Sequence, residues 1–168
     1  MANAVNCSLM WTCAATSELL ASWREEGFVC LQCHEPGFGR ATPDNYLAVK
    51  LSSPYISNWK LAWTCRATQE LLNSWSNNGY QYVKCNEPGW GGGWETEDNY
   101  FAIRVLPKDP NHSPKNITIE LDWKCNTTQS DMALWHQNGF TYVKCDEPGL
   151  GGPGSSSDNY LAIKILTP

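Results

Sequence analysis

Cys85-Asn-Glu-Pro-Gly-Trp-Gly91, followed by Asp98-Asn-Tyr-Phe-Ala102, is the stretch that decides the fold, because a version of it occurs three times. The other copies begin at Cys33 and Cys145, and they keep Glu-Pro-Gly and Asp-Asn-Tyr unchanged. A repeat period of about 50 to 60 residues is typical of architectures in which neighbouring copies complete one core. We therefore expect three repeats, which together form one compact domain and span residues 1–53, 54–109 and 110–168.

Each repeat has a strand pattern, a helix pattern and two further strand patterns. Apolar and polar residues alternate from Ile117 to Trp123, which predicts the first strand of the last repeat. A capping threonine and a closing glycine predict the helix ends, at Thr16, Thr68 and Thr128 and at Gly27, Gly79 and Gly139. The predicted fold class is α+β, with three tandem β-α-β-β repeats of about 50 residues, each with one disulfide, packed with pseudo-threefold symmetry.

The last strand of each repeat predicts where the core lies. In the middle repeat, Phe101, Ile103 and Val105 face one way, while Tyr100, Ala102 and Arg104 face the other. The same period places three residues of the last repeat on the core face, namely Leu161, Ile163 and Ile165. Helix tryptophans are expected to be buried in all three repeats, at Trp23, Trp75 and Trp135.

The eight cysteines predict a disulfide framework and hence a secreted, extracellular protein. One pair with a spacing of twenty recurs in each repeat, which predicts bridges Cys13–Cys33, Cys65–Cys85 and Cys125–Cys145. Cys7 and Cys30 occur only in the first repeat, and they could pair within the chain or join two chains into a homodimer. Glycosylation sequons support secretion, at Asn6, Asn111, Asn116 and Asn126. Residues 1–5 lack the features of a signal peptide, which we interpret as a mature chain with an added initiator Met.

Charge and hydropathy exclude two classes of partner. The net charge is −5 and the twelve Lys and Arg residues are scattered, so no basic tract is present that could neutralise nucleic-acid phosphates. The apolar runs are too short to cross a bilayer, so membrane insertion is not expected.

The triplicated loops are the candidate binding sites. Their polar ends are identical while the core positions drift among apolar residues, and a core requires only volume and apolarity. Carboxylates and amides can bind vicinal hydroxyls, and an aromatic ring can cover the C–H face of a sugar. The candidate ligand-binding residues are Glu35, Asp44, Asn45, Tyr46, Glu87, Trp90, Trp94, Asp98, Asn99, Tyr100, Glu147, Asp158, Asn159 and Tyr160.

Two alternatives apply to the same residues. The motif could be structural, because Asp caps turns, Asn holds a left-handed backbone and Pro-Gly makes a type II turn. It could also hold calcium through Glu87, Asp98, Asn99 and their equivalents, since these are hard oxygen ligands. The pattern is similar to elements of C-type lectins, but Gly stands where those have Asn, and the repeat is too short for their fold.

An enzyme is not expected. The histidines, at His34, His112 and His136, occupy no common repeat position, so no nucleophile–base constellation recurs. Glu87 and Asp98 could form a glycosidase pair, but three catalytic centres in one small chain would be unusual. Three weak binding sites gain avidity on a surface that carries many copies of one glycan.

In repeat number, cysteine content and polar loops, the whole chain resembles the secreted tandem-repeat lectins of invertebrates. It lacks the Gln-Xaa-Trp signature of ricin-type β-trefoils. The resemblance implies a multivalent lectin for glycans that end in galactose or N-acetylgalactosamine, with one site per repeat. The alternative is a non-catalytic extracellular structural or protein-recognition module, such as an egg-coat, defence or inhibitor component.

Overall fold

The computed structural model describes residues 2–12, 15–33, 45–65, 67–85, 99–125, 127–145 and 159–168. Within these ranges, strands account for 48% of the residues and helices for 24%. The first repeat contains β1 (Asn3–Ala4), β2 (Asn6–Thr12), α1 (Ser17–Glu25), β3 (Val29–Gln32) and β4 (Tyr46–Ser52). The second contains β5 (Ile56–Thr64), α2 (Gln69–Asn77), β6 (Gln81–Lys84) and β7 (Tyr100–Pro107). The third contains a 3-10 turn (Pro114–Asn116), β8 (Thr118–Lys124), α3 (Gln129–Gln137), β9 (Thr141–Lys144) and β10 (Tyr160–Thr167).

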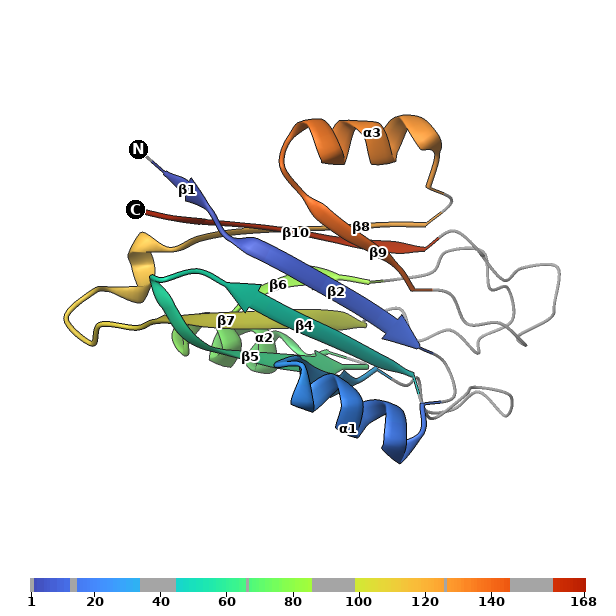
Figure 1. Ribbon diagram of the computed structural model, residues 1–168, viewed down its shortest axis with the longest axis horizontal. Coiled ribbons are helices and arrows are strands. Elements are labelled where there is room, and N and C mark those ends of the chain that lie inside the picture. The colour runs from blue at the N-terminus through green and yellow to red at the C-terminus, as the bar shows by residue number, and fades with distance from the viewer. Residues whose placement is uncertain are drawn as a thin grey trace, which may run out of the picture.

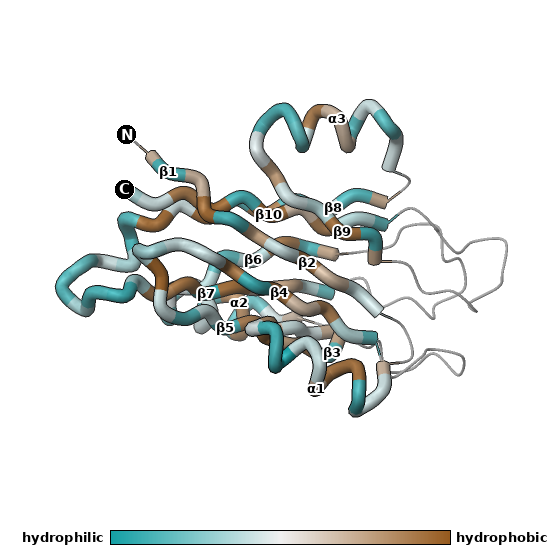
Figure 2. Tube along the Cα trace, in the orientation of Figure 1, coloured by the Kyte–Doolittle hydropathy of each residue, from teal (hydrophilic) through white to brown (hydrophobic). Residues whose placement is uncertain are grey.

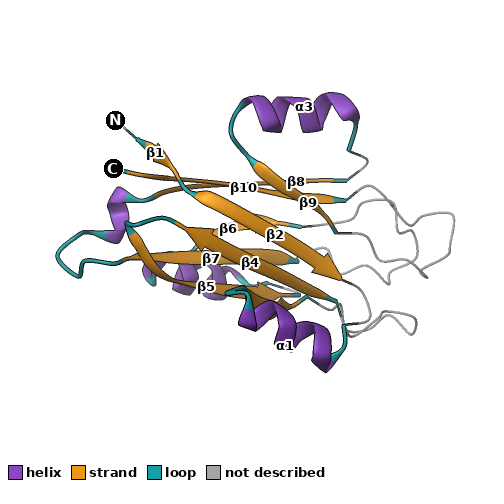
Figure 3. Cartoon of the chain, viewed as in Figure 1, coloured by secondary structure: helices purple, strands orange, loops and turns teal. Residues whose placement is uncertain are grey.

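The expected α+β class with a disulfide in each repeat was wrong. The described chain is mostly β-sheet, organised as three small antiparallel sheets with three short helices outside them (Figure 3). Each helix is nine residues long and covers part of one sheet, so the strands dominate the architecture.

The last strand of each repeat lies at the centre of its sheet. The strand orders are β2-β4-β3 and β5-β7-β6, and β10 lies between β8 and β9 in the third sheet. Neighbouring sheets meet where β3 lies beside β5, β6 beside β8, and β9 beside β2, so the three sheets follow one another in a closed ring (Figure 1). The short strand β1 also pairs with β10, which joins the two ends of the chain.

The interior of the ring is one shared core. The central strands contribute the side chains that were predicted for it, Phe101, Ile103, Val105, Leu161, Ile163 and Ile165, together with Leu47, Val49 and Leu51 of the first repeat. All of these are buried. Hydrophobic residues recur along these strands in Figure 2, as expected for strands with an inner face that is shielded from water. The Nε1 of Trp59 donates to the carbonyl oxygen of Val49 at 3.0 Å, which ties the second repeat to the first.

The outer face of each sheet packs against its own helix. In the second repeat, Leu72 and Trp75 of α2 bury Ala102 of β7 completely. Trp23, Trp75 and Trp135 are all buried, as predicted. The predicted helix ends are also confirmed, because the side-chain oxygens of Thr16, Thr68 and Thr128 accept backbone N–H bonds, and Gly27, Gly79 and Gly139 have positive φ angles.

The predicted disulfides are absent from the described cysteines. Thr64 and Lys84 both lie opposite Tyr100, so the next residues, Cys65 and Cys85, flank the central strand from either side. Their Cα atoms are therefore two strand spacings apart, roughly 9–10 Å, whereas a disulfide requires Cα atoms less than about 7 Å apart. The same registers separate Cys125 from Cys145 in the third repeat. Cys13 lies outside the described residues, as does any bridge that it would make to Cys33.

Candidate functional site at the motif end of the ring

The described residues of the triplicated motif lie at one end of the ring, which we call the motif end. In each repeat, the residues that flank the motif are joined by a backbone hydrogen bond of 2.7 Å, from Cys33 to Asn45, Cys85 to Asn99 and Cys145 to Asn159. In Figure 1, the strand ends that carry these residues all point to the same side of the molecule, away from both termini. The described ends of the three copies, the cysteines and the asparagines, therefore lie at the same end of the ring.

Several predicted site residues lie outside the described residues. They are the six carboxylates and two tryptophans between the flanks, namely Glu35, Asp44, Glu87, Trp90, Trp94, Asp98, Glu147 and Asp158. The asparagines and tyrosines of the motif are described, so the geometry of the site rests on them.

The three asparagines are buried. Asn45, Asn99 and Asn159 expose 0%, 1% and 0% of their surface. Buried amides act as hydrogen-bonding anchors within the protein, because an unsatisfied polar group in the interior is costly. Their burial favours a structural role, in which each asparagine fixes the end of its loop beside the core.

The tyrosines lie on the outer faces of the sheets. Tyr46, Tyr100 and Tyr160 each begin a central strand and are half-buried. The Tyr100 ring meets the Tyr82 ring edge to face at 5.7 Å, and Tyr82 lies 6.3 Å from the buried Trp75. This aromatic row leads from the helix to the motif end, and 36% of Tyr82 is exposed.

The third repeat has the same aromatic row. Tyr160 contacts Tyr142 with ring centroids 5.9 Å apart, and Tyr142 contacts Trp135 at the same distance. Tyr82 and Tyr142 were not predicted as site residues. Strand period alone could not have found them, because their place on the outer face beside Tyr100 and Tyr160 follows from the pairing of Tyr82 with Ala102 and of Tyr142 with Ala162.

The first repeat lacks this row, because Cys30 stands where the others have tyrosine. Cys30 pairs with Ala48 of the outer face, whereas Cys7 pairs with Leu51 of the inner face. The two thiols lie on opposite faces of one sheet, so the alternative in which they pair within the chain is wrong, whereas pairing between two chains stays a prediction. Burial raises the pKa of Cys7 to about 11. Burial also raises the pKa of Cys30, against the opposing effect of Arg24.

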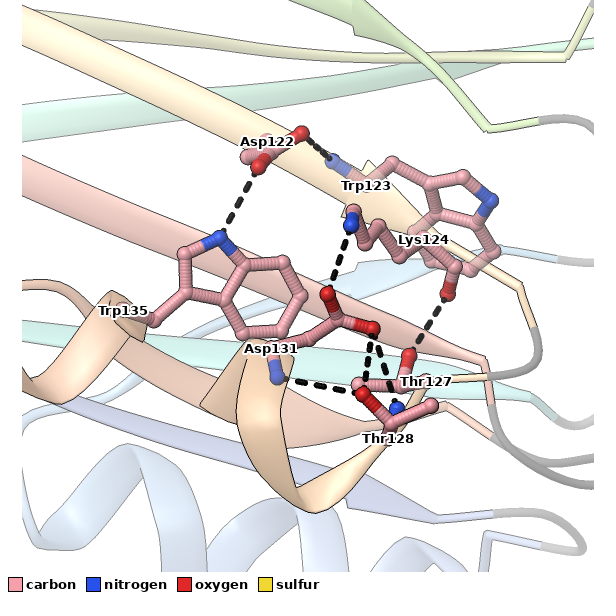
Figure 4. A network of polar contacts seen from close by, with 7 residues as sticks. All are labelled: Asp122, Trp123, Lys124, Thr127, Thr128, Asp131 and Trp135. Carbon is pink, nitrogen blue, oxygen red and sulfur yellow. Dashed lines mark hydrogen bonds and ion pairs between the residues drawn. The ribbon is translucent and has the colours of Figure 1, made fainter. Parts of the chain in front are cut away.

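A polar network beside the motif end holds the start of α3 (Figure 4). Lys124 donates to Asp131 Oδ1 at 2.8 Å, while Asp131 Oδ2 accepts from the backbone N–H of Thr128 at 3.0 Å. The hydrogen bond from Lys124, followed by those from Thr128, lowers the pKa of Asp131 to about 2. Trp135 Nε1 donates to Asp122 Oδ2 at 2.8 Å, which fixes the indole that begins the aromatic row of the third repeat. These groups are engaged in folding contacts and point to no ligand.

The described residues contain no group of three His, Cys, Asp or Glu side chains that could hold a metal ion. The suggested calcium ligands Glu87 and Asp98 lie outside the described part, so a calcium site stays a prediction. No helix in the described ranges has the length and apolarity needed to span a bilayer. No known protein family, curated protein or solved structure matches the chain.

Proposed function

We propose that the protein is a non-catalytic, multivalent lectin that binds cell-surface or secreted glycans at the motif end of the ring. The observation that supports the proposal is that the described ends of all three motif copies lie at one end of the ring, with the half-buried Tyr46, Tyr100 and Tyr160 beside them. Sites that share one end can engage one glycan-bearing surface together, which multiplies weak affinities.

The chemistry of the motif suits a neutral sugar. The half-buried tyrosine rings supply an apolar surface with a polar edge, and the carboxylates of the motif sequence supply acceptors for hydroxyl groups. The buried asparagines contribute indirectly, because their backbone carbonyl groups accept the N–H groups of the motif cysteines and so join the two ends of each motif copy. Glycans with terminal galactose or N-acetylgalactosamine, met outside the cell, are the proposed partners.

The repeats are expected to differ in affinity. The second and third repeats each carry two adjacent tyrosines on the outer face, at Tyr82 with Tyr100 and at Tyr142 with Tyr160. The first has Tyr46 and Cys30 at the equivalent positions. The second and third sites therefore carry most of the binding in this proposal.

A glycan array, run with and without EDTA, tests the proposal. Tyr100→Ala combined with Tyr160→Ala should reduce binding by about fivefold to tenfold or more, since each lost ring contact is worth roughly 1 kcal/mol. Tyr100→Phe with Tyr160→Phe keeps the rings and serves as the matched control, and it should retain most of the binding. Loss of binding in EDTA would add calcium to the site.

The competing function is a structural or protein-recognition module. The burial of Asn45, Asn99 and Asn159 favours it, because the motif would then be a folding element. A glycan array that stays silent for the folded wild-type protein would overturn the lectin proposal in favour of this one.

A further inference from the structure

A hollow of about 570 Å³ lies at the end of the ring opposite the motif. Its walls are the start of the chain around β1 and β2, the turn between β4 and β5, and the end of β10. In Figure 1 this is the side where both termini and the β4–β5 turn lie together. The hollow has the size of a small-molecule site, and it is made where the two ends of the chain meet, so its walls are not repeated three times.

The lining combines apolar surface with uncharged polar groups, and none of its described residues has a charged side chain. Its amides and hydroxyls come from Asn3, Asn6, Ser52, Ser53 and Thr167. A charged ligand would find no oppositely charged side chain in this lining, and a purely apolar ligand would strip its amides and hydroxyls of water without replacing the lost hydrogen bonds.

The side chains of three lining residues make hydrogen bonds within the protein that hold the walls of the hollow together. Asn3 Nδ2 donates to the carbonyl oxygen of Pro168 at 2.9 Å, and the Thr167 hydroxyl donates to the carbonyl oxygen of Asn3 at 3.4 Å. Ser53 Oγ accepts from the backbone N–H of Tyr55 at 3.1 Å. These bonds hold the walls in place before any ligand arrives, which reduces the entropic cost of binding.

In protein that carries no glycan at the Asn6-Cys-Ser sequon, Asn6 and Ser52 remain available to a ligand. They pair directly across β2 and β4, so their side chains emerge on the same face within about 5 Å of each other. Both are exposed, and neither side chain makes a hydrogen bond to another described residue. An amide beside a hydroxyl offers donors and acceptors at a spacing that suits two neighbouring hydroxyl groups.

Tyr55 adds an apolar surface to the same hollow. Its ring stacks on His112 with centroids 4.7 Å apart and planes within 3°, which fixes the ring in place. Pro54 extends the apolar wall beside it. A fixed ring next to paired hydrogen-bonding groups suits a ligand with one hydroxyl-bearing side and one C–H side.

We propose that this hollow binds a small neutral, hydroxyl-rich molecule of monosaccharide or disaccharide size, held by Asn6 and Ser52 against Tyr55. Within the described part of the chain the site occurs once and lies away from the motif end, and it stands independently of the proposed lectin function.

The test is an NMR titration of isotope-labelled protein made in bacteria, where Asn6 remains unmodified. Glucose, galactose, N-acetylglucosamine and trehalose are titrated to high millimolar concentration. Binding should shift the side-chain amide signal of Asn6 and the backbone signals of Ser52 and Tyr55. Asn6→Ala with Ser52→Ala should weaken binding about tenfold or more, since two hydrogen bonds are lost. Ser76→Ala with Asn77→Ala, on the exposed side of α2, is the matched control and should change nothing.

The position of the shifted signals separates this proposal from the lectin proposal. Shifts around Asn6 and Ser52 support the hollow, whereas shifts around Tyr100 and Tyr160 report the motif end. Absence of shifts at Asn6, Ser52 and Tyr55 with all four sugars would overturn the present proposal, whatever happens at the motif end. Equal binding by the double variant and the wild-type protein would overturn it as well.

Discussion

Asp131 shows how one side chain can couple stability to pH. It closes the capping box of α3 and binds Lys124 at 2.8 Å, and these bonds hold its pKa at about 2, below the ordinary 3.8. Because the folded-state pKa is lowered, the stabilisation is fully present above the ordinary pKa and is lost as the pH falls through about 2.

We therefore expect Asp131→Asn to lower the melting temperature at neutral pH and the difference from the wild-type protein to shrink between about pH 4 and pH 2. Thermal unfolding measured by circular dichroism across this range would check it. A difference that stays constant down to pH 2 would contradict the assigned role. Because 24% of the Asp131 side chain and 46% of the Lys124 side chain are exposed to solvent, the effect should also weaken in high salt.

At the residue scale, the sequence predicted the helix caps but not the aromatic row. The capping threonines and closing glycines act through the backbone of their own helix, so local sequence is sufficient to predict them. Tyr82 belongs to the aromatic row through its contact with Tyr100, which lies eighteen residues later in the chain and on the neighbouring strand. Such a pairing depends on strand order and register, which local sequence does not state.

At the scale of elements, replacing the glycine that ends a helix tests why glycine recurs at this position in every repeat. Gly79 ends α2 with φ of +85°, and a Cβ there would meet Arg104 Nε at an ordinary 3.8 Å. The cost of a side chain at this position therefore comes from the backbone conformation and not from a clash. Gly79→Ala should lower the free energy of unfolding by about 1 kcal/mol.

Gly79→Asn is the matched control, because asparagine tolerates the left-handed region better than alanine does. Urea denaturation of both variants would measure the difference, with the asparagine variant the more stable. Equal loss in the two variants would indicate a packing effect in place of the backbone effect.

At the scale of the whole molecule, the closure of the ring depends on β1. Asn3 and Ala4 pair with Thr167 and Leu166, Val5 donates to the carbonyl oxygen of Ile165 at 2.9 Å, and the Val5 side chain is buried in the shared core. Deleting residues 1–5 should lower the free energy of unfolding by roughly 3 kcal/mol, through lost apolar burial and lost hydrogen bonds.

Val5→Ala, which keeps the strand pairing, should lose roughly half as much, and urea denaturation would compare the two. If the deletion is no worse than Val5→Ala, then β1 does not contribute to ring closure. The deletion would also remove one wall of the hollow, so it should abolish binding there.

The sequence by itself determined the repeats, the helix ends and the core face of the central strands. These features follow from local backbone chemistry and from the period of apolar residues, both of which are written along the chain. It did not determine the cysteine pairing, because equal spacing does not reveal that a central strand lies between Cys65 and Cys85. Only the tertiary structure decided the ring, the burial of Asn45, Asn99 and Asn159, and the hollow beside Asn6, because each arises where segments distant in sequence meet.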